Sequence, residues 1–91
     1  LYYLAWATAS LGDLDKAAML VGQSLNLAPQ DPYANYIDGL IKFVSGNRTG
    51  AVDAFRLALD NGYPSAMLAS DPLISDLHSE RAFSRLIGKA S

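Results

Sequence analysis

A six-residue pattern returns after 34 residues, and it most constrains how this chain can fold. Residues 12–17 read Gly-Asp-Leu-Asp-Lys-Ala and residues 46–51 read Gly-Asn-Arg-Thr-Gly-Ala, so a glycine, a short polar residue and an alanine recur at matching offsets. Each copy follows an apolar segment that favours a helix and opens another one. Self-similarity at a fixed period of this length is typical of repeat architectures. The spacing therefore predicts two copies of one helical unit.

Capping residues mark the ends of four expected helices. Gly12 can end the apolar segment 1–11 in a left-handed conformation, and Asp13 can cap a helix from 14 to about 27. Asp31-Pro32 signals the start of a third helix over 33 to about 45. A fourth is expected from about 49 to 59, ended by Asn61-Gly62. No segment alternates with period two for long enough to predict a strand, so we expect an all-α fold.

The third expected helix and the tail carry more specific expectations. The helix presents a broad apolar face and a polar stripe of Asn35, Asp38 and Lys42, in which Asp38 and Lys42 can pair. In the tail we expect a short helical turn within 64–70, a short helix after Asp71-Pro72, and a last helix capped by Ser79 and stopped at Gly88. Such a tail can cover the end of a helical stack. The covering residues would be Leu73, Leu77, Phe83, Leu86 and Ile87, with Arg81, Arg85 and Lys89 in water.

Superposing the copies at 34 residues aligns small residues with small ones and bulky residues with bulky ones. The small pairs are Ala5/Gly39, Ala17/Ala51 and Ser24/Ala58, and the bulky pairs are Val21/Phe55 and Leu25/Leu59. Small residues let two antiparallel helices approach closely, and the bulky residues then fill the space between layers.

At these residues the chain resembles the tetratricopeptide repeat (TPR) family. The matching positions are Ala5, Gly12, Ala17, Ser24-Leu25 and Pro29 in copy one, and Gly39, Gly46, Ala51 and Ala58-Leu59 in copy two, with Tyr63 in place of the closing proline. The resemblance implies a TPR-like right-handed superhelix of antiparallel helical hairpins, an α-α solenoid with a C-terminal capping helix. Its single domain would comprise repeat one (about 1–30), repeat two (about 31–63) and a capping segment (64–91).

The sequence departs from the family in the third helix, where Asn35, Asp38 and Lys42 stand at positions that usually hold large apolar residues. Either that helix is rotated or the turn before Gly46 is one residue shorter. The tail resembles endings of bacterial multidomain regulators that carry such repeats. Because the chain starts at Leu1 within an apolar segment, we expect a fragment of a longer protein.

Composition and charge limit the classes of partner that we expect for this chain. The formal net charge of −2 gives no general attraction to phosphates, which argues against direct nucleic-acid binding. The uncharged run 1–12 is too short to cross a bilayer and lacks the basic start of a signal peptide. The chain has no cysteine, so thiol chemistry is excluded and the compartment stays open, with the cytoplasm favoured and the periplasm compatible.

The chain offers little for catalysis. His78 is its one histidine, and its neighbours Asp76 and Ser79 are too close in sequence to converge on it as a triad. The segment 46–50 lacks the lysine and the preceding strand of a phosphate-binding loop, and the acidic residues lack metal-ligand spacing. We therefore expect no enzyme, with no catalytic, cofactor-binding or metal residues and no small-molecule substrate.

The family resemblance points instead to protein binding. First helices of successive TPR units line the concave groove, which by resemblance assigns the apolar, aromatic-rich partner-binding residues Tyr2, Trp6, Tyr33, Tyr36, Leu40 and Phe43. These side chains suit the anchoring of a peptide or neighbouring domain, although several could equally be core residues. Lysine and asparagine pairs that hold a terminal carboxylate in some family members are missing there. The alternative is structural: the N-terminal helix drives homodimerisation or docks within a signalling or transcription regulator.

Overall fold

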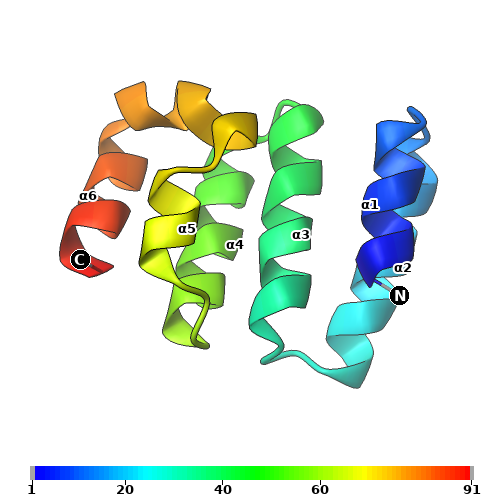
Figure 1. The fold of residues 1–91 in the computed structure, drawn as a ribbon. Helices are drawn as coiled ribbons and strands as arrows, with labels where there is room; N and C mark the ends of the chain where they lie inside the picture. Colours follow the sequence, from blue (N-terminus) through cyan, green and yellow to red (C-terminus); the bar gives the residue numbers. More distant parts are fainter. Residues whose placement is uncertain (1, 91) are drawn as a thin grey trace.

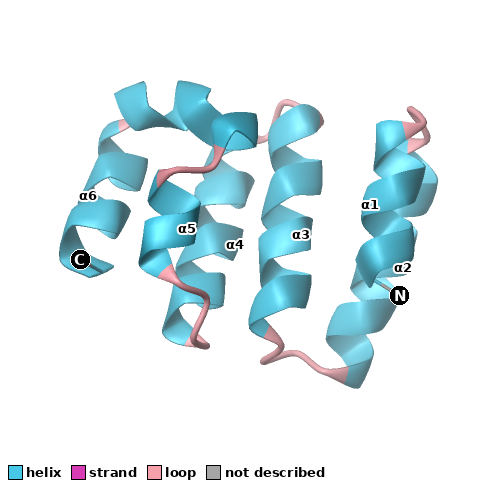
Figure 2. Ribbon diagram, viewed as in Figure 1, coloured by secondary structure: helices cyan, strands magenta, loops and turns pink. Residues whose placement is uncertain are grey.

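The structure, a computed structural model, describes residues 2–90, with the side chains of residues 4–77 and 80–87. This part of the chain is helical between short turns and contains no strand (Figure 2), so the all-α prediction is confirmed over it. The elements are α1 (Tyr2–Ser10), α2 (Leu14–Leu27), α3 (Pro32–Val44), α4 (Arg48–Asp60), α5 (Ser65–Ala69), the 3₁₀ helix η1 (Pro72–Ser79) and α6 (Arg81–Ala90).

The first four helices form two antiparallel pairs (Figure 1). Helices α1 and α2 pack against each other as hairpin one, and α3 and α4 pack as hairpin two. Helix α3 also contacts α1 and α2, so hairpin two lies directly against hairpin one. Helix α6 contacts α4, α5 and η1, and it lies at the opposite end of the molecule from hairpin one (Figure 1).

The turn inside each hairpin has the same geometry in both copies. Gly12 and Gly46 adopt positive φ angles of 95° and 90°, as left-handed residues that end α1 and α3. The N–H of Gly12 donates to the carbonyl of Ala9 and that of Asp13 to the carbonyl of Thr8. The residues 34 positions later make the same two bonds, from Gly46 to Phe43 and from Asn47 to Lys42.

Side-chain caps start each of the next helices, as predicted for Asp13 and Asp31 but not for Asn47. The Asp13 carboxylate accepts from the Lys16 N–H at 3.1 Å, and the Asn47 side-chain oxygen accepts from the Gly50 N–H at 2.9 Å. Asp31 caps α3 by accepting from the Tyr33 N–H at 2.9 Å, and Pro32 occupies the first turn, where no amide donor is needed. These bonds satisfy amide groups that a helix start would otherwise leave without a partner.

The expected pairs of small and bulky residues lie in the core. Ala17 and Ala51 are both 0% exposed, so the two copies bury this alanine equally. Position 39 requires glycine because the Phe55 ring approaches its backbone closely: a Cβ atom there would lie 2.4 Å from Cε1 of Phe55. In copy one the matching residues are Ala5 and Val21, both buried. Copy one thus combines Ala5 with the smaller side chain of Val21, whereas copy two combines Gly39, which has no side chain, with the larger ring of Phe55.

The C-terminal segment covers hairpin two. Leu68, Ile74, Leu77 and Phe83 are fully buried, and the Phe83 ring meets the Phe55 ring edge-on with centroids 6.1 Å apart. Leu86 and Ile87 pack partly buried against this core. Arg81 and Arg85 are exposed, as expected.

Several details of the sequence interpretation were wrong. Asn35 is 2% exposed rather than part of a polar stripe, because its amide donates to the carbonyl of Asp31 at 3.1 Å. Leu73 is about half exposed instead of covering the core. Residue 79 ends η1 and does not cap α6, which begins at Arg81, and α6 continues through Gly88 to Ala90. The Asp38–Lys42 pair is confirmed, with Nζ and Oδ2 2.8 Å apart.

Candidate functional site

The predicted partner-binding residues do not share one environment. Leu40 is 1% exposed and belongs to the core, so it is not available to a partner. Trp6 and Phe43 are partly buried against that core, and the Arg48 guanidinium lies 5.7 Å from the centre of the Phe43 ring. Tyr33 is exposed by 49%. The Tyr2 side chain lies outside the described residues.

Tyr36 belongs to an aromatic cluster that joins hairpin two to the C-terminal segment. Its ring stacks on Tyr63 with centroids 4.6 Å apart, and the Tyr33 ring meets Tyr63 edge-on at 5.8 Å. The Tyr36 hydroxyl donates to Oδ2 of Asp71, whose other carboxylate oxygen accepts from the Leu73 N–H at 2.9 Å. Asp71 therefore caps η1 and holds Tyr36, so Tyr36 is committed to packing within the chain.

Both buried tyrosines are held in the neutral form. Burial, with the hydrogen bond to the Asp71 carboxylate as the second cause, raises the pKa of Tyr36 well above its ordinary value near 10. Burial also raises the pKa of Tyr63. Neither hydroxyl is thus activated as a base or nucleophile, and the cluster is suited to packing rather than chemistry.

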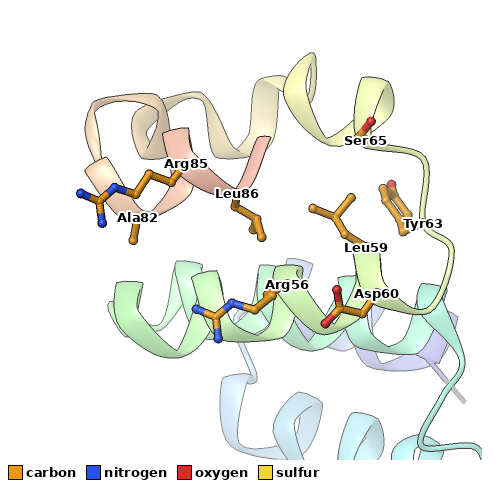
Figure 3. A pocket seen from close by; sticks show the side chains of 8 residues that line it. All are labelled: Arg56, Leu59, Asp60, Tyr63, Ser65, Ala82, Arg85 and Leu86. Carbon is orange, nitrogen blue, oxygen red and sulfur yellow. The ribbon is translucent and has the colours of Figure 1, made fainter. Parts of the chain in front are cut away.

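A groove lies between α4 and α6, with a volume of about 730 Å³ (Figure 3). We call it the α4–α6 groove; its lining residues are Arg56, Leu59, Asp60, Tyr63, Ser65, Ala82, Arg85 and Leu86. Leu59 and Leu86 are partly buried and approach each other across the gap, from α4 and α6 respectively (Figure 3). Its size is in the range of pockets that hold ligands.

The sequence interpretation did not identify this groove. Leu59 and Leu86 have the helical spacing of ordinary core residues, and the arginines of the tail were taken as a solvated face. The one available signal was Tyr63, an aromatic residue directly after Asn61-Gly62, which ends the fourth expected helix. Its position after this turn places an aromatic ring at one end of the groove.

A second surface feature is the apolar character of hairpin one. Leu4, Leu11, Met19 and Leu27 are all more than half exposed, with Leu11 at 88% and Leu27 at 79%. We call these four residues the hairpin-one apolar set. Single exposed side chains of this kind are unremarkable, and what distinguishes these four is that they all belong to one hairpin.

Neither a metal-binding cluster nor a membrane-spanning helix occurs in the described part of the chain. Among the side chains of residues 4–77 and 80–87, acidic groups do not gather in a group of three or more that could hold a metal ion. Each helix within residues 2–90 is too short to span a bilayer.

Comparisons with known proteins leave the chain without an assigned relative. No protein-family model, curated protein or solved structure matches it.

Proposed function

We propose that this chain is a non-catalytic protein–protein interaction scaffold that binds a peptide or a neighbouring domain. In this proposal its two hairpins are TPR-like units of a right-handed superhelix, and α6 is the capping helix. Two observations support the repeat: the turns at Gly12 and Gly46 make the same hydrogen bonds, and Ala17 and Ala51 are equally buried.

The observation that carries the binding role is a comparison between the two hairpins. The hairpin-one apolar set consists of Leu4, Leu11, Met19 and Leu27, and the residues 34 positions later are Asp38, Ser45, Asp53 and Asn61. Hairpin two folds with polar side chains at all four positions, so the fold itself does not need apolar ones there. Leaving large apolar side chains in water forgoes the free energy of burying them. The set is therefore best explained by contact with another protein.

Aromatic residues on the first helices extend the apolar surface offered to a partner. Tyr33 is half exposed, and Trp6 and Phe43 keep part of their surface accessible. Aromatic side chains of this type supply much of the binding energy at protein interfaces. Leu40 lies in the core and Tyr36 is partly buried against it, so these two residues support the surface instead of contacting the partner.

The test exchanges the apolar set for the residues of hairpin two. The variant Leu4→Asp/Leu11→Ser/Met19→Asp/Leu27→Asn should keep its helical circular dichroism and its Tm within a few degrees, because none of these side chains is buried. A large fall in Tm would instead show that the set stabilises the hairpin itself, and the binding role would be rejected.

Partner contact is measured by a photo-reactive amino acid placed at position 19 in the natural protein in cells. We expect a cross-link to a defined peptide of another protein. Placing the same group at position 53, the exposed hairpin-two equivalent of Met19, provides the matched control and should give no such product. Equal labelling at position 53 would contradict the proposal.

Self-association is the second candidate, favoured by the same apolar set. A homodimer through hairpin one would appear as a mass that rises with concentration in sedimentation equilibrium and returns to a monomer in the four-residue variant. A monomer over the whole concentration range would exclude it. A dimer that survives in the variant would place the interface elsewhere.

A further inference from the structure

The α4–α6 groove has an apolar centre between two ends of different charge. Leu59 and Leu86 lie opposite each other at its centre, and Tyr63 lies at one end beside Leu59 (Figure 3). The side chains of Arg56 and Arg85 extend toward the other end, one from each wall (Figure 3). A ligand that fits must therefore combine an apolar group with a group that complements the arginines.

The arginine end favours a negatively charged ligand. Arg56 and Arg85 outnumber the single acidic residue of the lining, Asp60, although the whole chain carries a formal charge of −2. Arg56 pairs with Asp53, with Nη2 and Oδ1 3.1 Å apart, but both side chains are more than half exposed. Such an exposed pair is weak and is readily exchanged for a carboxylate of a ligand. Arginine is also the residue best suited to bind carboxylates, because its guanidinium donates in a planar fork.

The opposite end distinguishes between kinds of anionic ligand. Asp60 lies on the Tyr63 side of the groove, away from the two guanidinium groups (Figure 3). A ligand that carries negative charge along its whole length would be repelled there. A peptide instead offers backbone N–H groups, which can donate to the Asp60 carboxylate.

We propose that the α4–α6 groove binds an acidic peptide segment. Its carboxylates contact Arg56 and Arg85, and an apolar side chain next to them lies between Leu59 and Leu86. This adds a second site to the proposed interaction scaffold, at the opposite end of the molecule from hairpin one (Figure 1). The two sites share no residue, so either can fail in experiment without the other.

The test uses a fluorescein-labelled decapeptide in which glutamate and leucine alternate in one half and the other half is uncharged, titrated with the full chain and followed by fluorescence anisotropy. We expect saturable binding that weakens as salt rises. Arg56→Gln and Arg85→Gln should each weaken binding by about threefold to tenfold, in line with the loss of one exposed charge-assisted contact. The matched control is Arg81→Gln, which removes the same charge from the same helix at an exposed position outside the groove, and it should change the Kd less than about twofold.

Three outcomes would overturn the proposal. One is no saturable binding of the glutamate–leucine peptide, and another is equal binding of a peptide with glutamine or lysine in place of glutamate. The third is a loss in Arg81→Gln as large as in Arg85→Gln, which would indicate general charge attraction. Amide chemical-shift changes on the unaltered chain give a readout independent of the variants: they should gather on α4, Tyr63 and α6, and changes confined to hairpin one would refute the site.

Discussion

The contact between Gly39 and Phe55 allows the packing logic of the repeat to be tested quantitatively. A Cβ atom on residue 39 would lie 2.4 Å from Cε1 and 2.6 Å from Cδ1 of the Phe55 ring. Favourable carbon–carbon contacts are about 3.5–4.0 Å long, so the ring would have to move. It has little room, because it is fully buried and meets the rings of Tyr36 at 6.0 Å and Phe83 at 6.1 Å.

The expected magnitude follows from two opposing effects. Overpacking a core by one methyl group costs about 1–3 kcal/mol, whereas alanine is favoured over glycine within a helix by about 1 kcal/mol. We therefore expect Gly39→Ala to destabilise the fold by up to about 2 kcal/mol. Phe55→Val alone should cost about 2–4 kcal/mol, because it leaves a cavity beside Phe83.

The decisive measurement is the double variant, which gives hairpin two the Ala–Val pair that hairpin one has at Ala5 and Val21. Once the ring is absent, Gly39→Ala should stabilise by about 1 kcal/mol through helix propensity. The effect of the same substitution thus changes sign between the two backgrounds. The predicted coupling between Gly39 and Phe55 is about 1–3 kcal/mol, which is the cost of overpacking.

Urea denaturation followed by circular dichroism at 222 nm measures all four proteins of this cycle. Gly22→Ala serves as the control, because Gly22 lies within α2 and a Cβ atom there meets no atom within 4 Å. It should stabilise by about 1 kcal/mol. If Gly39→Ala stabilises as much as Gly22→Ala in the original chain, or if the coupling is below about 0.5 kcal/mol, the close approach of α3 and α4 is refuted.

Three further predictions concern other parts of the core. Ala17→Leu and Ala51→Leu should each lose about 1–3 kcal/mol by overpacking, and a thermal melt with no loss in either would count against equivalent packing. The buried Ser24 hydroxyl has no hydrogen-bond partner in the described part of the chain, so Ser24→Ala should stabilise by up to about 1–2 kcal/mol in urea denaturation; a loss would disprove this. Because the folded-state pKa values of Tyr36 and Tyr63 are raised, stability should fall as pH rises above about 10, where tyrosines of the unfolded chain ionise. Above pH 10, Tyr36→Phe should reduce the fall of the free energy of unfolding with pH by about 1.4 kcal/mol per pH unit. An unchanged dependence on pH would refute the link between Tyr36 ionisation and stability.

The sequence predicted helix boundaries well where the deciding chemistry is local. Gly12 and Gly46 end helices because glycine adopts positive φ without strain, and Asp31 starts α3 because its carboxylate reaches amides two and three residues away. Such signals depend on a few neighbouring residues. They can therefore be interpreted before the chain is folded.

Interactions between distant residues could not be predicted in this way. The polar side chain of Asn35 suggested an exposed position, but the connection before α3 places the carbonyl oxygen of Pro29 3.4 Å from the nitrogen of its amide. The bond from Tyr36 to Asp71 joins residues 35 positions apart. The α4–α6 groove likewise depends on how α6 packs against α4, and neither helix carries a pattern that specifies it.

The two hairpins share a backbone pattern but differ in how they use their surfaces. Hairpin two directs Phe55 and Tyr36 into contacts with the C-terminal segment, so these two aromatic side chains are satisfied within the chain. Hairpin one has the smaller Val21 at the position of Phe55 and carries its surplus apolar residues on the surface. In a repeat architecture each unit is stabilised mainly by its neighbours. Hairpin one therefore has more to gain from an external partner than hairpin two, which is why we place the principal binding surface there.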